Sequence, residues 1–402
     1  IIMELLDPIH GEIELNSAEV AVLDSAAYQR LRSIKQLGFS EFSFPGATHN
    51  RYLHSLGVCH LAGRAFDSIF KKFEFSSPAL KSRLRQTVRL AALLHDIGHV
   101  PLRHTTEDVM PRLKDLNVRA YANKKNPPDP NRQANHEDYT IKFITDSSLT
   151  KVLRENFSDI DPVAIACLVD TELVSPNGFF RDGDWDFRPV MSQIVSSEMD
   201  VDRLDYLERD AYFCGTNYGK VETGWLIGNL SVHSNKGALH LALNRRALYT
   251  FDDFLLARHH MHLMVYFHHK SIIFEEMLGR YLTSKDCKFF LPANIEEYIQ
   301  CTDHSLFQQH EKVDNDWARR ISERRPFKML FELHSDHETD RADRIKASLE
   351  KEGIAVIKAS SQARLSKYHS GNLTKNPTIY VIDEYDHLSV PEPIEQSTKI
   401  FK

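Results

Sequence analysis

An almost unbroken apolar run, Val88–Leu94, leads straight into the segment LLHDIGHVPLRH at residues 93–104. A run of this length enters a protein interior, where ionisable side chains are costly unless they are paired or bind a metal. Any fold of this chain must therefore give a buried helix an ionisable end. The four side chains at that end are His95, Asp96, His99 and His104.

The spacing in this segment suits a metal site. Within the helix that ends here, His95 and His99 lie four residues apart and share a face, and Gly98 and Pro101 favour a break just beyond it. His95 and Asp96 can reach one ion if the helix stops at them. Carboxylate oxygen and neutral imidazole suit Mn, Fe, Mg or Zn. The alternative is a set of hydrogen-bonded core histidines.

Composition narrows the class of protein. The chain has 402 residues, of which 42% are hydrophobic and 26% charged, and its net charge of −6 gives no basic signature of a nucleic-acid or membrane binder. Five scattered cysteines without a CxxC pair favour a reducing compartment. There is no apolar run of about 18 residues, and the first residues lack a basic start before an apolar core. We expect a soluble, cytoplasmic protein.

The periodicity predicts a mainly α protein with two parts. Residues 1–325 read as a helical domain, and residues 326–402 as a small α+β lobe for regulation or oligomerisation. Within that lobe we expect three strands and one helix closed by glycine. The strands are Lys328–Leu333, Ile354–Ala359 and Thr378–Asp383, and the helix is Arg341–Gly353.

Two further helices carry polar stripes. Asp202, Tyr206, Arg209 and Asp210 fall at i, i+4, i+7 and i+8, which places them on one helix face. A solvated, salt-bridged face is the alternative reading of that stripe. A second stripe has i, i+4, i+8 spacing and again combines a cation, an imidazole and a phenol. It consists of Arg258, His262 and Tyr266.

Together these residue types predict metal-assisted hydrolysis of a phosphoester. Arginines supply forked donors for phosphate oxygens, a metal would polarise the phosphoryl group and acidify water, and histidines transfer protons near neutral pH. The candidate phosphate ligands are Arg51, Arg203, Arg209 and Arg258, the candidate metal ligands His54, His95, Asp96 and Asp202, and the candidate proton-transfer groups His99, His104 and His136.

The motif H…HD…D, formed by His54, His95-Asp96 and Asp202, resembles that of the HD-domain metal-dependent phosphohydrolases. Five motifs in the right order are similar to the deoxynucleoside triphosphate triphosphohydrolases (dNTPases, dGTPases) of this superfamily, nearest to the branch of the human sterile-alpha-motif and HD-domain dNTPase and its bacterial relatives. The resemblance covers roughly residues 5–330. The motifs are DPIHGEIEL, YQRLRSIKQLG, FPGATHNRYLHSLGVCHLAG, LLHDIGHVPLRH and DVDRLDYLERD.

The resemblance implies roles for single residues. His54, His95, Asp96 and Asp202 match the metal ligands. His104 matches the histidine that protonates the leaving 5′-oxygen, Glu107 a supporting acid, and His99 and His136 histidines lining the phosphate site. The implied reaction converts a dNTP and water into deoxynucleoside and triphosphate.

The remaining matches concern the nucleotide. Gln36 and Asp210 match groups that bind the sugar 3′-hydroxyl, and Leu37 and Tyr266 match side chains that exclude a 2′-hydroxyl. Phe267 stands where the human branch has glutamine near the base, so base preference is not carried over. The triphosphate contacts are Arg51, Arg203, Tyr206 and Arg258, and His262 matches a residue near the α-phosphate and sugar.

The resemblance also implies a homo-oligomer, a tetramer or dimer, activated by dGTP or GTP bound between subunits. Asp24, Gln29 and Arg32 match residues that recognise a guanine nucleotide, and Arg324 and Lys328 match basic residues of an adjoining activator site. The N-terminal segment of the family includes a lysine and an asparagine in this site, whereas this chain has Met3 and Leu6. The alternative is that QRLRSIKQLG is a basic amphipathic helix that packs on its neighbours.

Two other functions compete with the dNTPase reading. One is an HD phosphodiesterase or 5′-nucleotidase, although the arginines exceed what a monophosphate needs. The other is a nucleotide-sensing or nucleic-acid-binding module with a vestigial site, although every metal ligand is present.

Overall fold

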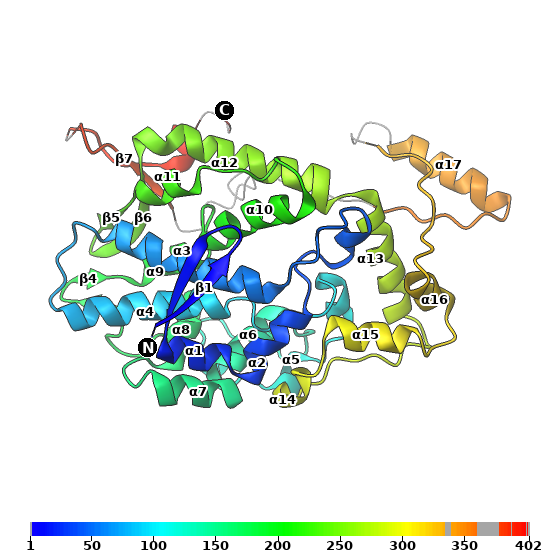
Figure 1. Cartoon of the computed structure of the whole chain (residues 1–402), viewed down its shortest axis with the longest axis horizontal. Helices are drawn as coiled ribbons and strands as arrows, with labels where there is room; N and C mark the ends of the chain where they lie inside the picture. The colour runs from blue at the N-terminus through cyan, green and yellow to red at the C-terminus, as the bar shows by residue number, and fades with distance from the viewer. Residues whose placement is uncertain (1, 334–338, 360–377, 387, 399, 401–402) are drawn as a thin grey trace.

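The computed structural model of the chain describes residues 2–333, 339–359, 378–386, 388–398 and 400. Layers of helices form its body, and a short β-hairpin crosses the middle of that body (Figure 1). The predicted mainly α fold is confirmed. No helix within the described part of the chain is both long and apolar enough to cross a membrane.

Three helices form the centre of the body. Helix α3 (Arg51–Ile69) packs against α4 (Pro78–Leu94) and against α10 (Val201–Cys214). Asn50 caps α3 and Ser77 caps α4, each by accepting a backbone N–H three residues ahead. The last turns of α4 are fully buried, as the apolar run predicts, and this burial fixes where the ionisable end of the helix lies.

The strands form two sheets. β1 (Ile2–Asp7) and β2 (Gly11–Asn16) pair in an antiparallel hairpin. The second sheet has the order β3-β4-β6-β7-β8, with β5 paired to the other edge of β6, and β7 lies parallel to β6. Its strands are β3 (Arg181–Asp182), β4 (Trp185–Asp186), β5 (Leu230–Asn235), β6 (Ala238–Asn244), β7 (Tyr380–Ile382) and β8 (Glu392–Pro393).

The predictions for the C-terminal residues are met in part. The helix forms as α17 (Thr339–Lys351), with Gly353 in the left-handed region just beyond it, and the last strand forms as β7. The predicted strands at Lys328–Leu333 and Ile354–Ala359 are wrong, because both segments lack strand pairing. A short apolar run is stable as a strand only where a neighbour takes up its backbone hydrogen bonds. β7 has such a neighbour in β6.

The other helices surround this centre. Figure 1 shows α12 covering α10 on one side, while α17 projects away from the body. These helices are α1 (Ser17–Leu23), α2 (Ala26–Gln29), α5 (Leu113–Leu116), α6 (His136–Thr145), α7 (Ser148–Asn156), α8 (Pro162–Val169), α9 (Arg188–Val195), α11 (Thr223–Gly228), α12 (Leu248–Met261), α13 (His269–Leu282), α14 (Ile295–Tyr298), α15 (Asp303–His310), α16 (Asp316–Ser322) and α18 (Ile394–Ser397).

Candidate active site

The four predicted metal ligands come together where α3, α4 and α10 meet. His54 Nε2 lies 3.0 Å from Asp202 Oδ1 and 3.9 Å from Asp96 Oδ2. His95 Nε2 lies 3.5 Å from Asp202 Oδ1 and 3.7 Å from Asp96 Oδ1. Two imidazoles therefore face two carboxylates around one point, and ligand atoms of His54, His95 and Asp96 lie close enough together to share an ion.

The end of α4 explains how adjacent residues reach this point. The helix stops at Leu94, and His95 is its C-cap. His99 therefore lies beyond the helix, and the prediction that it shares a helix face with His95 is wrong. The backbone bends after His95 instead, with His99 N–H donating to Asp96 O at 3.0 Å. Because of this bend, His95 and Asp96 lie in the cluster with His54, whereas His99 lies in a second cluster of histidines.

The donor atoms of this cluster fit a divalent cation. Nε2 of His54 and Nε2 of His95 are buried and make no hydrogen bond in the described structure. The ring of His95 is fixed from its other side, where Nδ1 lies 2.7 Å from Ala92 O. A buried nitrogen without a hydrogen bond is costly unless a ligand completes it. Carboxylates beside such nitrogens provide the remaining ligands that Mn, Fe, Mg or Zn accept.

The pKa shifts within the cluster also favour binding of a cation. Burial disfavours charge on His54, but Asp202 and Asp205 outweigh it and raise the pKa of His54 to about 10. Burial also opposes ionisation of Asp96 and Asp202, yet Arg51 and His95 hold the pKa of Asp96 below its ordinary value, and His54 and His95 do the same for Asp202. The site thus keeps its carboxylates ionised and attracts positive charge, which a metal can supply in place of a proton.

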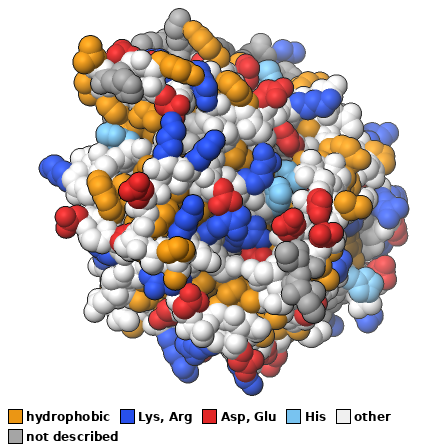
Figure 2. All heavy atoms as spheres, turned by 60° about the vertical axis from the view of Figure 1, so that its left-hand side comes forward, with side chains coloured by type: hydrophobic (Ala, Val, Ile, Leu, Met, Phe, Trp, Pro, Cys, Tyr) orange, Lys and Arg blue, Asp and Glu red, His pale blue; other side chains and the backbone are white. Residues whose placement is uncertain are grey.

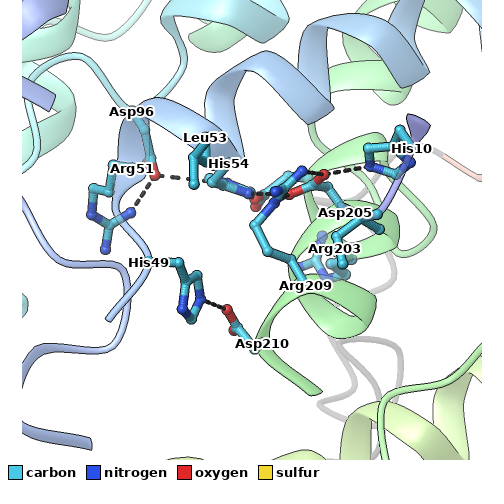
Figure 3. Close-up of polar contacts among 12 residues, drawn as sticks. His10, His49, Arg51, Leu53, His54, Asp96, Arg203, Asp205, Arg209 and Asp210 are labelled. Atoms are coloured by element: carbon cyan, nitrogen blue, oxygen red, sulfur yellow. Dashed lines mark hydrogen bonds and ion pairs between the residues drawn. The ribbon is translucent and has the colours of Figure 1, made fainter. Parts of the chain in front are cut away.

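A second buried network holds His54 from behind. Asp205 Oδ2 lies 2.7 Å from His54 Nδ1, and Asp205 Oδ1 lies 2.6 Å from Nε2 of His10 in the turn of the hairpin (Figure 3). Arg209 is fully buried and donates to both Asp205 and Asp7. The prediction that Arg209 binds phosphate is therefore wrong, because its guanidinium is occupied on the side of the helix that faces the hairpin.

We expect Asp205→Asn to lower the affinity for Mn²⁺ by about 10- to 100-fold, because the carboxylate keeps the Nδ1 proton of His54 in place and its Nε2 free. The unfolding free energy should also fall, by about 3 kcal/mol, since Arg209 loses one of two partners. Calorimetric titration with Mn²⁺ and thermal unfolding measure the two effects. Asp7→Asn is the matched control: it weakens the pairing of Arg209 without touching His54. Equal losses of Mn²⁺ affinity in both variants would contradict this role.

Three further histidines form a second cluster beside the first. The ring centroids of His99, His104 and His136 lie 4.8 to 5.3 Å apart. Glu107 joins two of them, with Oε1 at 3.0 Å from His104 Nδ1 and 2.5 Å from His136 Nδ1. His104 begins the short 3₁₀ helix η3 (His104–Val109), and its side chain is 66% exposed, so it can reach a bound molecule.

The histidines of this cluster differ in charge. Burial, with Arg51 and His136 nearby, holds the pKa of His99 well below its usual range. Burial also opposes protonation of His136, but Glu107 outweighs it and raises the pKa of His136. Burial opposes ionisation of Glu107, but hydrogen bonds with His104 and His136 outweigh it and lower the pKa of Glu107 to about 2. The neutral imidazole of His99 therefore lies beside the ion pair of His136 and Glu107. Such an arrangement is typical of sites that catalyse proton transfer.

The predicted sugar-side residues also meet. Asp210 Oδ1 lies 2.6 Å from His49 Nε2, and its other oxygen accepts a hydrogen bond from Tyr266 OH at 2.8 Å. Gln36 is buried, and its Oε1 makes no hydrogen bond in the described structure. The adjacent Leu37 is 2% exposed. The backbone N–H of Gln36 donates to His49 O at 3.0 Å, so these groups are connected through His49.

The Arg258 stripe is built differently from its prediction. α12 ends at Met261, and residues His262–Tyr266 form a π-turn, in which Phe267 N–H donates to His262 O. π-turns occur often at functional sites. His262 Nδ1 is within 2.8 Å of Arg258 O, and the His262 ring lies 5.0 Å from the Tyr266 ring. The three side chains still share one region, although the wider turn shifts their register.

Each predicted phosphate-binding arginine is held by a carboxylate. Arg51 bonds Asp96, Arg203 bonds Asp200, and Arg258 bonds Glu198 at 2.9 Å. Tyr206 lies on the same helix as Arg203, and its ring is 6.2 Å from that of Tyr266. Paired arginines keep their forks in fixed directions and remain charged, which suits recognition of a polyanion.

The predicted activator residues lie away from these clusters. Gln29 and Arg32 bond one another at 2.8 Å, and the guanidinium of Arg32 lies 3.7 Å from the centre of the Tyr52 ring. Asp24 is exposed at the end of α1. Arg324 and Lys328 are exposed beyond α16. Their role in binding a nucleotide stays a prediction.

Several residues of the site were missed by the sequence reasoning. His49 contacts the predicted residue Asp210, and Asp205 contacts the predicted residue His54. His10 reaches the site indirectly, through Asp205. The spacing held one signal: Asp205 follows Asp202 by three residues on the same helix, so the two carboxylates are neighbours. His10 and His49 had none, because their partners lie more than 150 residues away in the chain.

The chain matches the model of the HD domain over residues 51–210 and that of the HD-associated region over residues 221–363. All four clustered candidate ligands fall inside the first match. An uncharacterised protein of Mycoplasma genitalium is 33% identical over 272 residues, which are 67% of this chain and 57% of that protein. The chain thus spans little more than half the length of such relatives.

Some of the relatives carry names that state an activity. The deoxynucleoside triphosphate triphosphohydrolase SAMHD1 of Homo sapiens is 33% identical over 224 residues, 52% of this chain and 33% of that protein. The SAMHD1 homologue of Dictyostelium discoideum is 29% identical over 308 residues, 75% of this chain and 53% of that protein.

Solved structures share the fold. A crystal structure of a hypothetical protein from Aquifex aeolicus has a TM-score of 0.73 at 24% identity, covering 100% of this chain and 93% of that one. With consecutive matches to the HD domain and its associated region, and with the ligand motif folded into one cluster, the chain belongs to the HD-domain phosphohydrolase family.

Proposed function

We propose that this protein hydrolyses deoxynucleoside triphosphates to deoxynucleosides and triphosphate. The observation that carries the proposal is the juxtaposition of the His54, His95, Asp96 and Asp202 cluster with three arginines and with the hydrogen-bonded group of His49, Asp210 and Tyr266. The names of the SAMHD1 relatives support the same substrate class.

His54, His95, Asp96 and Asp202 would hold the divalent cation on which HD domains depend. When bound, such a cation polarises a phosphoryl oxygen and lowers the pKa of a water molecule. Asp205 fixes the ring of His54, and Ala92 O fixes that of His95, so that both Nε2 atoms face the centre of the cluster.

Arg51, Arg203 and Arg258 would bind the triphosphate. Each is oriented by its carboxylate before the substrate arrives, so little side-chain entropy is lost on binding. Developing negative charge on the α-phosphate is stabilised by these fixed donors. A monophosphate needs fewer cations, and this favours a triphosphate substrate over the phosphodiesterase and 5′-nucleotidase alternatives.

His104 would protonate the departing 5′-oxygen. Its Nδ1 lies against Glu107, which leaves the exposed Nε2 edge for the substrate. His99 and His136 would line the phosphate site beside it. On the sugar side, Gln36 and Asp210 would bind the 3′-hydroxyl, Leu37 and Tyr266 would exclude a 2′-hydroxyl, and His262 would lie near the α-phosphate.

The nucleic-acid alternative lacks comparable support. Figure 2 shows acidic and basic side chains interspersed on one face of the molecule, in keeping with the net charge of −6. Activation by dGTP or GTP between the subunits of a tetramer or dimer is the finer part of the proposal. It depends on the exposure of Asp24, Arg324 and Lys328.

The proposal predicts release of intact tripolyphosphate from dNTPs. The protein is incubated with each dNTP and each NTP under Mn²⁺ and under Mg²⁺, and the phosphate products are separated by anion exchange. We expect tripolyphosphate and deoxynucleoside in equal amounts, with NTPs hydrolysed at least tenfold more slowly. Pyrophosphate or orthophosphate as the first product would contradict the proposed bond cleavage.

A further inference from the structure

A buried carboxylate outside the described clusters connects two of their segments. Asp303, in the first turn of α15, is 5% exposed. Its Oδ1 accepts the backbone N–H of Leu102 at 3.0 Å, and its Oδ2 accepts the backbone N–H of Lys35 at 2.8 Å. These partners lie 201 and 268 residues away in the chain, so one side chain joins three distant segments.

The first of these segments carries His104. Leu102 and Arg103, the two residues before it, have φ values of 51° and 67°, in the left-handed region that residues with a side chain rarely adopt. Two consecutive strained residues persist only where the surroundings hold them. The hydrogen bond from Leu102 N–H to Asp303 is such a restraint, and Thr106 N–H donating to Arg103 O closes the turn on its other side.

The second segment carries the sugar-side residues. Lys35 forms an isolated β-bridge with Asn50, and the next residue, Gln36, donates its N–H to His49 O at 3.0 Å. Leu37 follows. The two segments also approach each other: the side chain of Arg103 packs against Gly38, where an added Cβ would lie 3.1 Å from Arg103 Cδ.

We propose that Asp303 is a positioning residue that fixes, with one oxygen each, the turn that presents His104 and the segment that presents Gln36 and Leu37. This role rests on the proposed function. It adds that one side chain holds both the segment that selects the sugar and the turn that carries the proton donor. An ionised carboxylate is needed because both of its oxygens must accept a hydrogen bond.

The chemistry of Asp303 supports this role. Burial raises the pKa of its carboxyl to about 6, so the group is ionised at neutral pH in spite of its environment. An asparagine has the same shape but offers one acceptor, and its amide group would face a backbone N–H as a second donor. Asp303→Asn therefore removes one of the two restraints and weakens the other without creating a cavity.

The test compares Asp303→Asn with wild type by hydrogen exchange and by kinetics. We expect the amides of Lys35 and Leu102 to exchange at least tenfold faster in the variant. Turnover of dNTPs should fall by about 10- to 100-fold with a smaller change in KM, and the preference for dNTP over NTP should fall by about tenfold. Both proteins are assayed well below their unfolding temperatures.

Glu19→Gln is the matched control. Glu19 is also a buried carboxylate, but it bonds Asn16, Gln86 and Arg89, none of which belongs to the site. Unchanged exchange at either amide, unchanged turnover, or the same changes in Glu19→Gln would overturn the proposal. Failure of the proposed function shows separately, as wild-type protein that releases no tripolyphosphate, because hydrogen exchange needs no substrate.

Discussion

Asp202→Asn is expected to reduce hydrolysis by about 10³-fold at a fixed, low concentration of Mn²⁺, because it removes the charged ligand that faces both histidines. Asp202 Oδ1 lies 3.0 Å from His54 Nε2 and 3.5 Å from His95 Nε2, so this carboxylate is central to the cluster. Polarisation by a bound metal is worth several kcal/mol in the transition state, and each 1.4 kcal/mol changes the rate tenfold.

Asparagine keeps the shape of the side chain, so the effect should come from charge and not from packing. Calorimetric titration with Mn²⁺ measures the loss of affinity independently of turnover, and saturating Mn²⁺ should restore part of the rate. Asp67→Asn serves as the control, since Asp67 is exposed and bonds Arg85 on the protein surface. Wild-type affinity for Mn²⁺ in Asp202→Asn would remove Asp202 from the ligand set.

The cluster of candidate metal ligands could be predicted from the sequence because the types of its residues are unusual in their local sequence context. An apolar run that ends in His95 and Asp96 requires a buried use for them, and His54 and Asp202 lie on two other predicted helices. α4 ends at Leu94, and the side chains of His95 and Asp96 both reach the cluster with His54. The position of His99 could not be read from its spacing, because a bend after His95 cancels the helical periodicity.

Arg209 shows why polarity alone does not identify a substrate contact. Its position on α10, next to Asp210 and seven residues after Asp202, looks like part of a substrate face. The hairpin places Asp7 within reach of that helix, and the guanidinium of Arg209 bonds Asp7 and Asp205. Such a choice depends on a contact between residues 202 positions apart, which helical spacing does not report.

The β-strands show the same limit in backbone structure. β5 and β6 were not predicted from the sequence. In the structure, Lys236 and Gly237 between them have φ values of 52° and 84°, as a tight hairpin turn requires. Lys236 is an unusual residue for such a turn, and the dominant helical pattern hid the short strands. Conversely, Lys328–Leu333 has strand-like composition but no strand beside it, so composition alone overstated the C-terminal sheet.

His104→Ala is expected to keep dNTP binding and to lower turnover by about 10²- to 10⁴-fold, the range for loss of a general acid. The imidazole is oriented by Glu107 through Nδ1, and its exposure leaves it free to meet a leaving group. It is not among the ligands of the metal cluster, so Mn²⁺ affinity should stay at the wild-type value. Nucleotide binding is measured by equilibrium titration with a dNTP in Ca²⁺, and turnover by release of tripolyphosphate in Mn²⁺.

His304→Ala is the control for removal of a histidine, since His304 is exposed on α15 and contacts Gln308. It should hydrolyse dNTPs at the wild-type rate. Glu107→Gln refines the assignment: it removes the charge that orients His104 but leaves the imidazole, so its loss of turnover should be smaller than that of His104→Ala. Full activity in His104→Ala would exclude it as the acid and leave His136, which shares Glu107, as the group that protonates the 5′-oxygen.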